Sequence, residues 1–136
     1  MRITKILLLL LILAITCSIS SCSSSRQTAP SKEEGGRLKI YTTFYPLYDF
    51  TKKIVGNLAD IETLIPAGAD PHDYELSLKQ TAELYDADVF IFLGESMEPW
   101  AQKLADQLKD KGIAVIEVGK GLIENDDPHI WLDPVL

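Results

Sequence analysis

The sequence predicts an α/β fold from Arg37 to Leu136, with helices covering a four-stranded parallel sheet. Two observations predict this class. Short apolar runs alternate with segments whose apolar residues recur at helical spacing. One run, Val89 to Leu93, is apolar throughout, as in parallel strands buried on both faces. Strands that alternate with helices form βαβ units with parallel strands, so we expect one such domain of 100 residues.

Residues 1–21 have the features of a signal peptide. Arg2 and Lys5 precede an unbroken apolar run from Ile6 to Ile15. A run of this length suits a signal-peptide core and is too short to span a bilayer. We therefore expect the protein to be exported.

Cys22 is the predicted site of lipidation. It follows Ile19-Ser20-Ser21, a branched apolar residue and two small ones, which resembles the lipobox of bacterial lipoproteins. A disulfide between Cys17 and Cys22 is the alternative, because an even cysteine count in an exported protein permits one. That bond would link two positions where there is no core to stabilise. We expect an extracytoplasmic chain, anchored to the bacterial cell membrane by lipid on Cys22.

Residues 22–36 are predicted to form the lipidated cysteine and a flexible tether. From Ser23 to Gly36 the only apolar side chain is Ala29, so the segment cannot bury enough surface to order itself. Loss of Arg2 and Lys5 with the leader takes the formal net charge from −7 to −9. This acidity argues against nucleic acid as a partner and is compatible with attracting cations, or with solubility alone.

The first half of the domain contains a strand, a helix and a second strand. Leu38 to Phe44 is predicted to be the first strand, and Pro46 fits the first turn of a helix. The apolar stripe of that helix is predicted to consist of Leu47, Phe50, Ile54 and Leu58. Ile61 to Ile65 forms the second predicted strand, and a loop rich in proline and glycine follows it.

The second half contains two helices and two strands. Ser77 and Gln80 match a capping box, which predicts a helix from there to about Asp86, before the Val89–Leu93 strand. The next helix is predicted from a stripe and a C-cap glycine, which are Trp100, Leu104, Leu108 and Gly112. Ile113 to Val118 supplies the fourth strand.

Both histidines follow the same dipeptide, in Asp70-Pro71-His72 and Asp127-Pro128-His129. The topology places each in a loop that leaves the carboxyl end of a strand, the edge where open α/β sheets bind ligands. Imidazole nitrogen binds zinc, copper, iron and nickel, and carboxylate oxygen admits manganese. The spacing alone leaves metal ligation and an ordinary surface position equally open.

Five stretches together resemble the metal-binding proteins of zinc and manganese ABC importers. They are 42–50 (TTFYPLYDF), 67–75 (AGADPHDYE), 86–89 (DADV), 94–100 (GESMEPW) and 127–134 (DPHIWLDP). In that family two α/β lobes are joined by a long helix, and the metal lies between them. The resemblance therefore implies an N-terminal lobe of a two-lobe, periplasmic-binding-protein-like fold, with His72 and His129 as metal ligands.

The resemblance also implies what the chain lacks. The second lobe of the family gives a further histidine and usually a carboxylate, which nothing in this sequence matches. The joining helix is predicted to begin with Asp133 as N-cap and Pro134 as first helical residue. The chain is therefore interpreted as signal, tether and a lobe at 37–136 truncated at the start of that helix. Two imidazoles fill about half of a tetrahedral zinc shell.

The family implies a monomeric solute-binding lipoprotein that is not an enzyme and delivers its metal to a membrane permease. The motifs at 71–75 (PHDYE) and 97–100 (MEPW) look more like those of zinc importers, which favours zinc over manganese as the transported ion. Zinc-specific relatives often carry a histidine-rich loop before the second ligand, whereas Leu122 to Asp127 contains three acids and no histidine. This departure weakens the case for zinc without removing it.

Other readings of the chain remain open. A metallohydrolase would use an open metal position to activate water, but no base or nucleophile constellation is visible. An adhesin or a nonfunctional remnant lobe is the remaining alternative. Among other residues, Trp100 is expected in the core and Trp131 either there or in the cleft. Exposed loop positions are expected for Asp73, Glu75, Glu95 and Glu98. Asp70 and Asp127 fit either a turn or a hydrogen bond to an imidazole.

Overall fold

The structure, a computed structural model, describes residues 36–133 and residue 135. The predicted signal peptide and Cys22 lie outside the described residues, as does Pro134, where the joining helix is expected to begin. No helix in the described part of the chain combines the length and the apolar character needed to cross a membrane.

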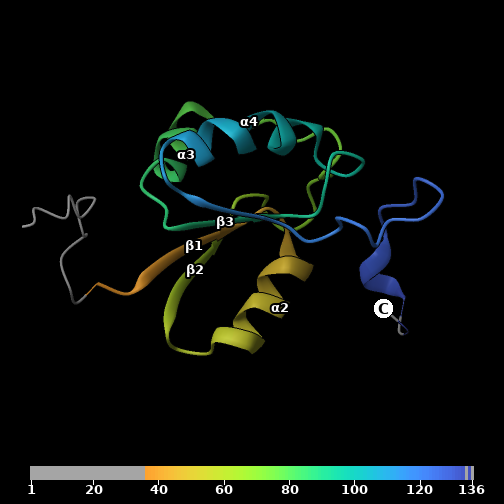
Figure 1. Cartoon of the computed structure of the whole chain (residues 1–136), viewed down its shortest axis with the longest axis horizontal. Coiled ribbons are helices and arrows are strands. Elements are labelled where there is room, and N and C mark those ends of the chain that lie inside the picture. The colour runs from red at the N-terminus through yellow and green to blue at the C-terminus, as the bar shows by residue number, and fades with distance from the viewer. Residues whose placement is uncertain (1–35, 134, 136) are drawn as a thin grey trace, which may run out of the picture. The chain divides into compact units, whose positions relative to one another are not determined.

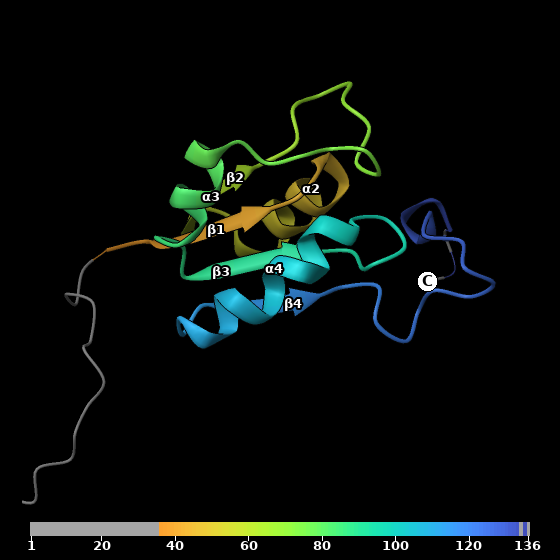
Figure 2. The same cartoon turned by 90° about the horizontal axis from the view of Figure 1, so that it is seen from above.

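The described residues form one parallel sheet of four strands, which confirms the predicted fold class. The strands are β1 (Leu38–Thr42), β2 (Ala59–Thr63), β3 (Val89–Phe92) and β4 (Ala114–Glu117). Their order is β2-β1-β3-β4, so the chain adds β2 on one side of β1 and the later strands on the other (Figure 2). In register, Ile40 lies opposite Ile61 of β2 and Val89 of β3. The direction of strand addition therefore switches between β1 and β3.

Helices cover both faces of this sheet. They are α2 (Tyr45–Val55), α3 (Leu78–Leu84) and α4 (Pro99–Asp110). In Figure 1, α2 lies against one face, whereas α3 and α4 lie against the other. Because successive residues of a strand point to opposite faces, the apolar strands can supply both layers with core side chains.

Two apolar clusters fill the spaces between the sheet and these helices. The cluster toward α3 and α4 includes Phe90 and Phe92, whose stacked rings have centroids 5.6 Å apart. The cluster toward α2 includes Ile40, Leu47 and Ile91. This alternation along β3 explains why its sequence is apolar at every position.

Two helix-start signals in the sequence are confirmed, the capping box of α3 and Pro46 in the first turn of α2. Ser77 Oγ accepts a hydrogen bond from the Gln80 N–H group (3.2 Å), and Gln80 Oε1 accepts one from the Ser77 N–H group (3.0 Å). Proline occupies the first turn of both α2 and α4. Gly112 follows the end of α4 with φ of +82°, a conformation that suits glycine.

The predicted apolar stripe of α2 is confirmed at Leu47 and wrong at its other three positions. The inward residues are Leu47, Thr51 and Val55, spaced by four positions, whereas Phe50 and Ile54 are exposed. The helix ends at Val55, before Gly56 with φ of +58°, so Leu58 is not part of it. Periodicity established that a helix is present, but the choice between two adjacent apolar stripes depends on how the helix lies across the sheet.

The core face of α4 includes Leu108 as predicted, but its other two buried positions are each one residue later than the predicted Trp100 and Leu104. Its buried residues are Ala101, Ala105 and Leu108, so small side chains let the helix approach the sheet closely. Trp100 is half-buried and touches both apolar clusters, so it is less enclosed than predicted.

Candidate metal-binding site

Two histidines from separate loops lie close together at the carboxyl edge of the sheet. His72 belongs to the loop between β2 and α3, and His129 directly precedes η2 (Ile130–Leu132), a short 3-10 helix that follows β4. Their ring centroids are 6.0 Å apart, with ring planes inclined at 57°. Both residues are exposed. The structure thus brings together the two imidazoles that the sequence singled out, and their role as metal ligands stays a prediction.

The same turn precedes each histidine. Asp70 Oδ1 accepts a hydrogen bond from the His72 N–H group (2.9 Å), and Asp127 Oδ1 accepts one from the His129 N–H group (3.0 Å). Such Asx turns explain why aspartate stands two residues before each histidine. The turn therefore fixes the local backbone conformation at each histidine.

Asp127 makes a second contact that Asp70 does not. Its Oδ1 atom lies 2.7 Å from Nδ1 of the His129 ring. These interactions, first the backbone hydrogen bond and then that of the ring, lower the pKa of Asp127 below its usual value. At neutral pH the carboxylate is therefore ionised and can only accept hydrogen bonds.

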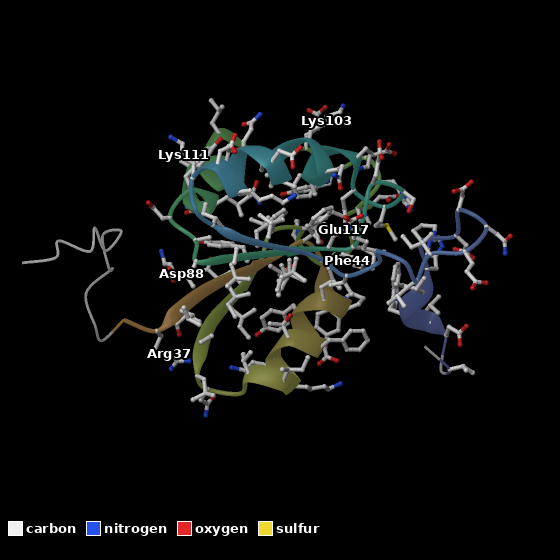
Figure 3. The ribbon with its side chains drawn as sticks, in the orientation of Figure 1. Arg37, Phe44, Asp88, Lys103, Lys111 and Glu117 are labelled. Atoms are coloured by element: carbon white, nitrogen blue, oxygen red, sulfur yellow. The ribbon has the colours of Figure 1, made fainter. Side chains whose placement is uncertain are left out.

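Aromatic packing supports His129 from the core. The Trp131 ring lies 5.3 Å from that of His129 and meets Phe44 edge-on at 4.9 Å, between centroids. Phe44 lies directly before α2 and is buried beside the sheet (Figure 3). Trp131 is half-buried, so it connects the apolar core to the exposed imidazole.

Hydrogen bonds hold the His72 loop to the end of β2. The Tyr74 hydroxyl donates to the Leu64 carbonyl oxygen (3.2 Å), and Gln80 Nε2 donates to the same oxygen (2.7 Å). Gln80 also belongs to the capping box of α3. The capping residues therefore fix both the start of a helix and the loop before it.

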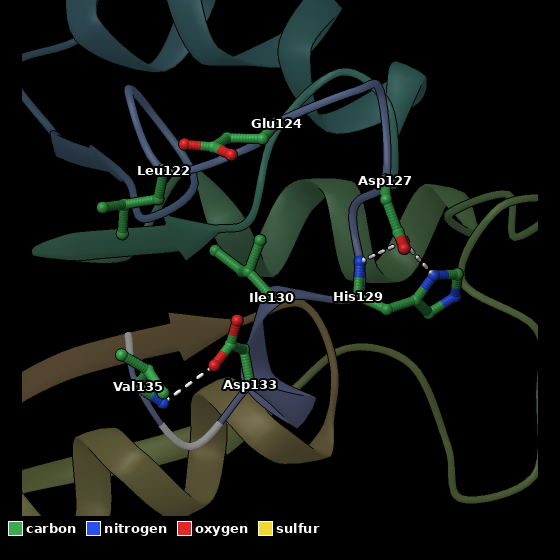
Figure 4. Close-up of a pocket in the computed structure, with 7 residues that line it drawn as sticks. All are labelled: Leu122, Glu124, Asp127, His129, Ile130, Asp133 and Val135. Carbon is green, nitrogen blue, oxygen red and sulfur yellow. Dashed lines mark hydrogen bonds and ion pairs between the residues drawn. The ribbon is translucent and has the colours of Figure 1, made fainter.

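The two histidines line a common cavity of about 420 Å³, together with Met97, Trp131 and the segment 68–71. His129 also borders a neighbouring pocket of about 320 Å³, drawn in Figure 4. Glu124, Asp127 and Asp133 contribute carboxylates to that second pocket, and Asp133 Oδ1 accepts a hydrogen bond from Val135 N–H (2.8 Å). The surroundings of His129 are therefore strongly acidic.

The prediction of an exposed loop position is wrong for Glu98. Asp73, Glu75 and Glu95 are exposed as expected, but the side chain of Glu98 is fully buried. Its position immediately before Pro99, at the start of α4, was the available signal, because helix starts in this topology lie at the ligand edge. Burial raises the pKa of Glu98, although hydrogen bonds from Thr43, Gly94 and Leu93 oppose that shift.

The arrangement offers two imidazole rings, whose nitrogen atoms are good ligands for zinc and other first-row transition metals. In residues 36–133 and 135, no group of three or more histidine, cysteine, aspartate and glutamate side chains is arranged to hold a metal ion. The side chains present therefore amount to a pair of nitrogen donors beside acidic groups.

The fold is that of the substrate-binding domains of metal-uptake systems. It matches the crystal structure of the Zn(II)-bound ZnuA-like domain of Streptococcus pneumoniae AdcA with a TM-score of 0.69 and 45% sequence identity, over 74% of this chain and 39% of that one. Residues 40–136 match the family described as zinc-uptake complex component A, periplasmic, and the chain belongs to this family.

Two further relatives show the range of the similarity. Zinc-binding lipoprotein AdcA of Streptococcus pneumoniae is 39% identical over 92% of this chain. The laminin-binding protein Lbp of Streptococcus pyogenes shares the fold with a TM-score of 0.62 and 36% identity, over 73% of this chain and 38% of that one. The chain spans 28% of the length of AdcA, so it corresponds to one part of that protein. The family is one of uptake components and not of enzymes.

Proposed function

We propose that this chain is the zinc-capturing N-terminal lobe of a solute-binding lipoprotein that serves an ABC importer. The observation that carries the proposal is the pair of exposed imidazoles, His72 and His129, 6.0 Å apart between ring centroids at the ligand edge of the sheet. Imidazole nitrogen is a good zinc ligand, and the chain belongs to a zinc-uptake family, so both observations support zinc capture.

The donor atoms favour zinc over manganese as the captured ion. Zinc binds imidazole nitrogen readily, whereas manganese prefers carboxylate and water oxygen. His72 and His129 supply two nitrogens, and the remaining positions of a tetrahedral shell fall to water or to other groups. The acidic surroundings, including Glu124 and Asp133, would raise the local concentration of any cation.

The capture site is tested by zinc titration with a competing chelator. We expect His72→Ala and His129→Ala each to weaken zinc binding by at least about tenfold, because each leaves a single imidazole. Lys103→Ala is a matched control, since Lys103 lies on the outer side of α4 (Figure 3). Unchanged zinc affinity in both histidine variants would exclude the proposal. Manganese, titrated in the same way, should bind more weakly.

We further propose that lipid on Cys22 anchors the protein outside the cytoplasm, where it passes zinc to a membrane permease. The tether, residues 23–36, would let the lobe reach from the membrane surface to the permease. Metabolic labelling with a fatty-acid analogue tests the anchor. Cys22→Ala should abolish the label and Cys17→Ala should retain it, and the reverse pattern would contradict the assignment.

Adhesion is a second candidate function, favoured by the similarity to the laminin-binding protein Lbp. Laminin immobilised on a sensor surface tests it directly. Saturable binding of the wild-type chain that is retained in His72→Ala would support adhesion independent of the metal. Absence of binding at micromolar protein would remove this candidate.

A further inference from the structure

Glu98 is a buried carboxylate that the proposed capture site does not use as a ligand. Its side chain has 0% exposure, although the residue lies at the edge of the sheet where ligands bind. A buried carboxylate is costly unless its oxygen atoms accept hydrogen bonds. An apolar side chain would fill this buried position at lower cost, so packing alone does not explain a carboxylate here.

Three donors converge on this carboxylate. The Thr43 hydroxyl donates to Oε1, and the N–H groups of Leu93 and Gly94 donate to Oε2 at 3.1 and 3.2 Å. Thr43 follows β1, whereas Leu93 and Gly94 follow β3. Glu98 therefore ties together the ends of the two strands between which the direction of strand addition switches. Open α/β sheets bind their ligands at such a switch point.

The carboxylate also lies within electrostatic range of one member of the histidine pair. Glu98 interacts electrostatically with His72. Its neighbour Met97, 1% exposed, lines the cavity that His72 and His129 share. The Glu98 carboxylate is thus buried next to a residue that lines this cavity, and water and salt screen a buried charge less than a surface charge.

We propose that Glu98 is a positioning residue for cation capture, which in its ionised form places a negative charge near the two imidazoles and ties together the ends of β1 and β3. This inference rests on the proposed function, since it requires a cation at the histidine pair. Groups around the ligands of a metal site typically change its affinity by about 10–100-fold when they are mutated.

Glu98→Gln removes the ionisable group but keeps nearly the same side-chain shape, so it tests the role of the charge. The amide oxygen can accept the two backbone N–H hydrogen bonds, and the amide nitrogen can donate to the Thr43 hydroxyl oxygen. The variant should therefore fold, as judged by circular dichroism and its thermal midpoint. We expect its zinc dissociation constant to rise about tenfold, at low and at high salt alike.

Glu95→Gln is the matched control, because Glu95 is an exposed carboxylate in the same loop and its loss changes the net charge equally. We expect less than about a twofold effect at low salt, and none at high salt, where surface charges are screened. Equal, salt-sensitive effects of E95Q and E98Q would overturn the inference in favour of general acidity. An unstable E98Q with unchanged zinc affinity would also overturn it.

A second variant keeps the inference testable if E98Q does not fold. Thr43→Val removes one donor to Glu98 and so favours its neutral form. Its zinc affinity relative to wild type should fall near neutral pH and recover as the pH rises. A ratio that does not change with pH would contradict a role for the charge.

If E98Q binds zinc like wild type while H72A does not, only this inference fails. Absence of zinc binding by the wild-type chain would overturn both proposals.

Discussion

The Nδ1 atom of His129 lies 2.7 Å from the Oδ1 atom of Asp127. An ionised carboxylate can only accept a hydrogen bond, so Nδ1 carries the proton and donates it. In this tautomer the lone pair is on Nε2, the atom that remains available to a metal ion. The contact therefore orients the ring and selects the nitrogen that would bind.

Asp127→Ala and Asp70→Ala form a matched pair of variants. Both lose the hydrogen bond to the backbone of a histidine, but only D127A loses a hydrogen bond to an imidazole ring. We expect D127A to weaken zinc binding by about 10–100-fold and D70A to have a clearly smaller effect. Equal losses in competition titrations would mean that the turn matters and the ring contact does not.

The stability of the wild-type chain should depend on the ionisation of Glu98. Burial raises its pKa in the folded state, so the folded chain holds this proton more tightly than the unfolded chain. The resulting stabilisation is present below the ordinary pKa of a glutamic acid and is lost as the pH rises through the raised value.

Glu98→Gln lacks this titration, so we expect it to be at least as stable as wild type near neutral pH. The difference should shrink as the pH falls, because the wild-type carboxyl then becomes neutral. Urea unfolding at a series of pH values measures this trend, with E95Q as the control for loss of one charge. A difference that grows toward acid pH would contradict the prediction.

Leu47 and Ile54 of α2 should differ sharply in their effect on stability. Leu47 is 2% exposed against the sheet, whereas Ile54 is 83% exposed. Leu47→Ala should cost about 3 kcal/mol of unfolding free energy because it leaves a cavity in the core. Ile54→Ala should change it by less than about 0.5 kcal/mol. Similar urea midpoints for the two variants would show that α2 packs through its other face.

Gly119 should not tolerate a side chain. A Cβ atom there would lie 2.7 Å from the Leu93 carbonyl oxygen and 2.8 Å from Cδ1 of Ile123. Because backbone must move to relieve the first contact, we expect Gly119→Ala to lose about 1–3 kcal/mol of stability. Gly36→Ala is the control, since its Cβ would meet nothing within 4 Å. A thermal midpoint of G119A equal to that of G36A would contradict this expectation.

The sequence was informative wherever a feature is local. The capping box at Ser77 and Gln80 depends on residues three positions apart and on nothing else in the fold, so it was predictable. The alternation of strands and helices is also local, and with the right-handed crossover it places the loops of His72 and His129 at one edge. The sequence could not decide whether Asp127 accepts a hydrogen bond from the backbone in a turn or contacts the imidazole ring. The structure shows that it does both.

The errors occurred where burial depends on distant parts of the chain. Residue pattern could not tell which apolar stripe of α2 faces the sheet, because that depends on how the helix lies across β1 and β2. Nor could it distinguish Glu98 from the exposed Glu95, because the burial of Glu98 depends on Thr43, 55 positions away. The sequence by itself determined the elements, their order and the edge at which the histidines lie. Only the tertiary structure decided the 6.0 Å approach of the two rings and the buried charge behind them, since both depend on packing between strand ends far apart in the chain.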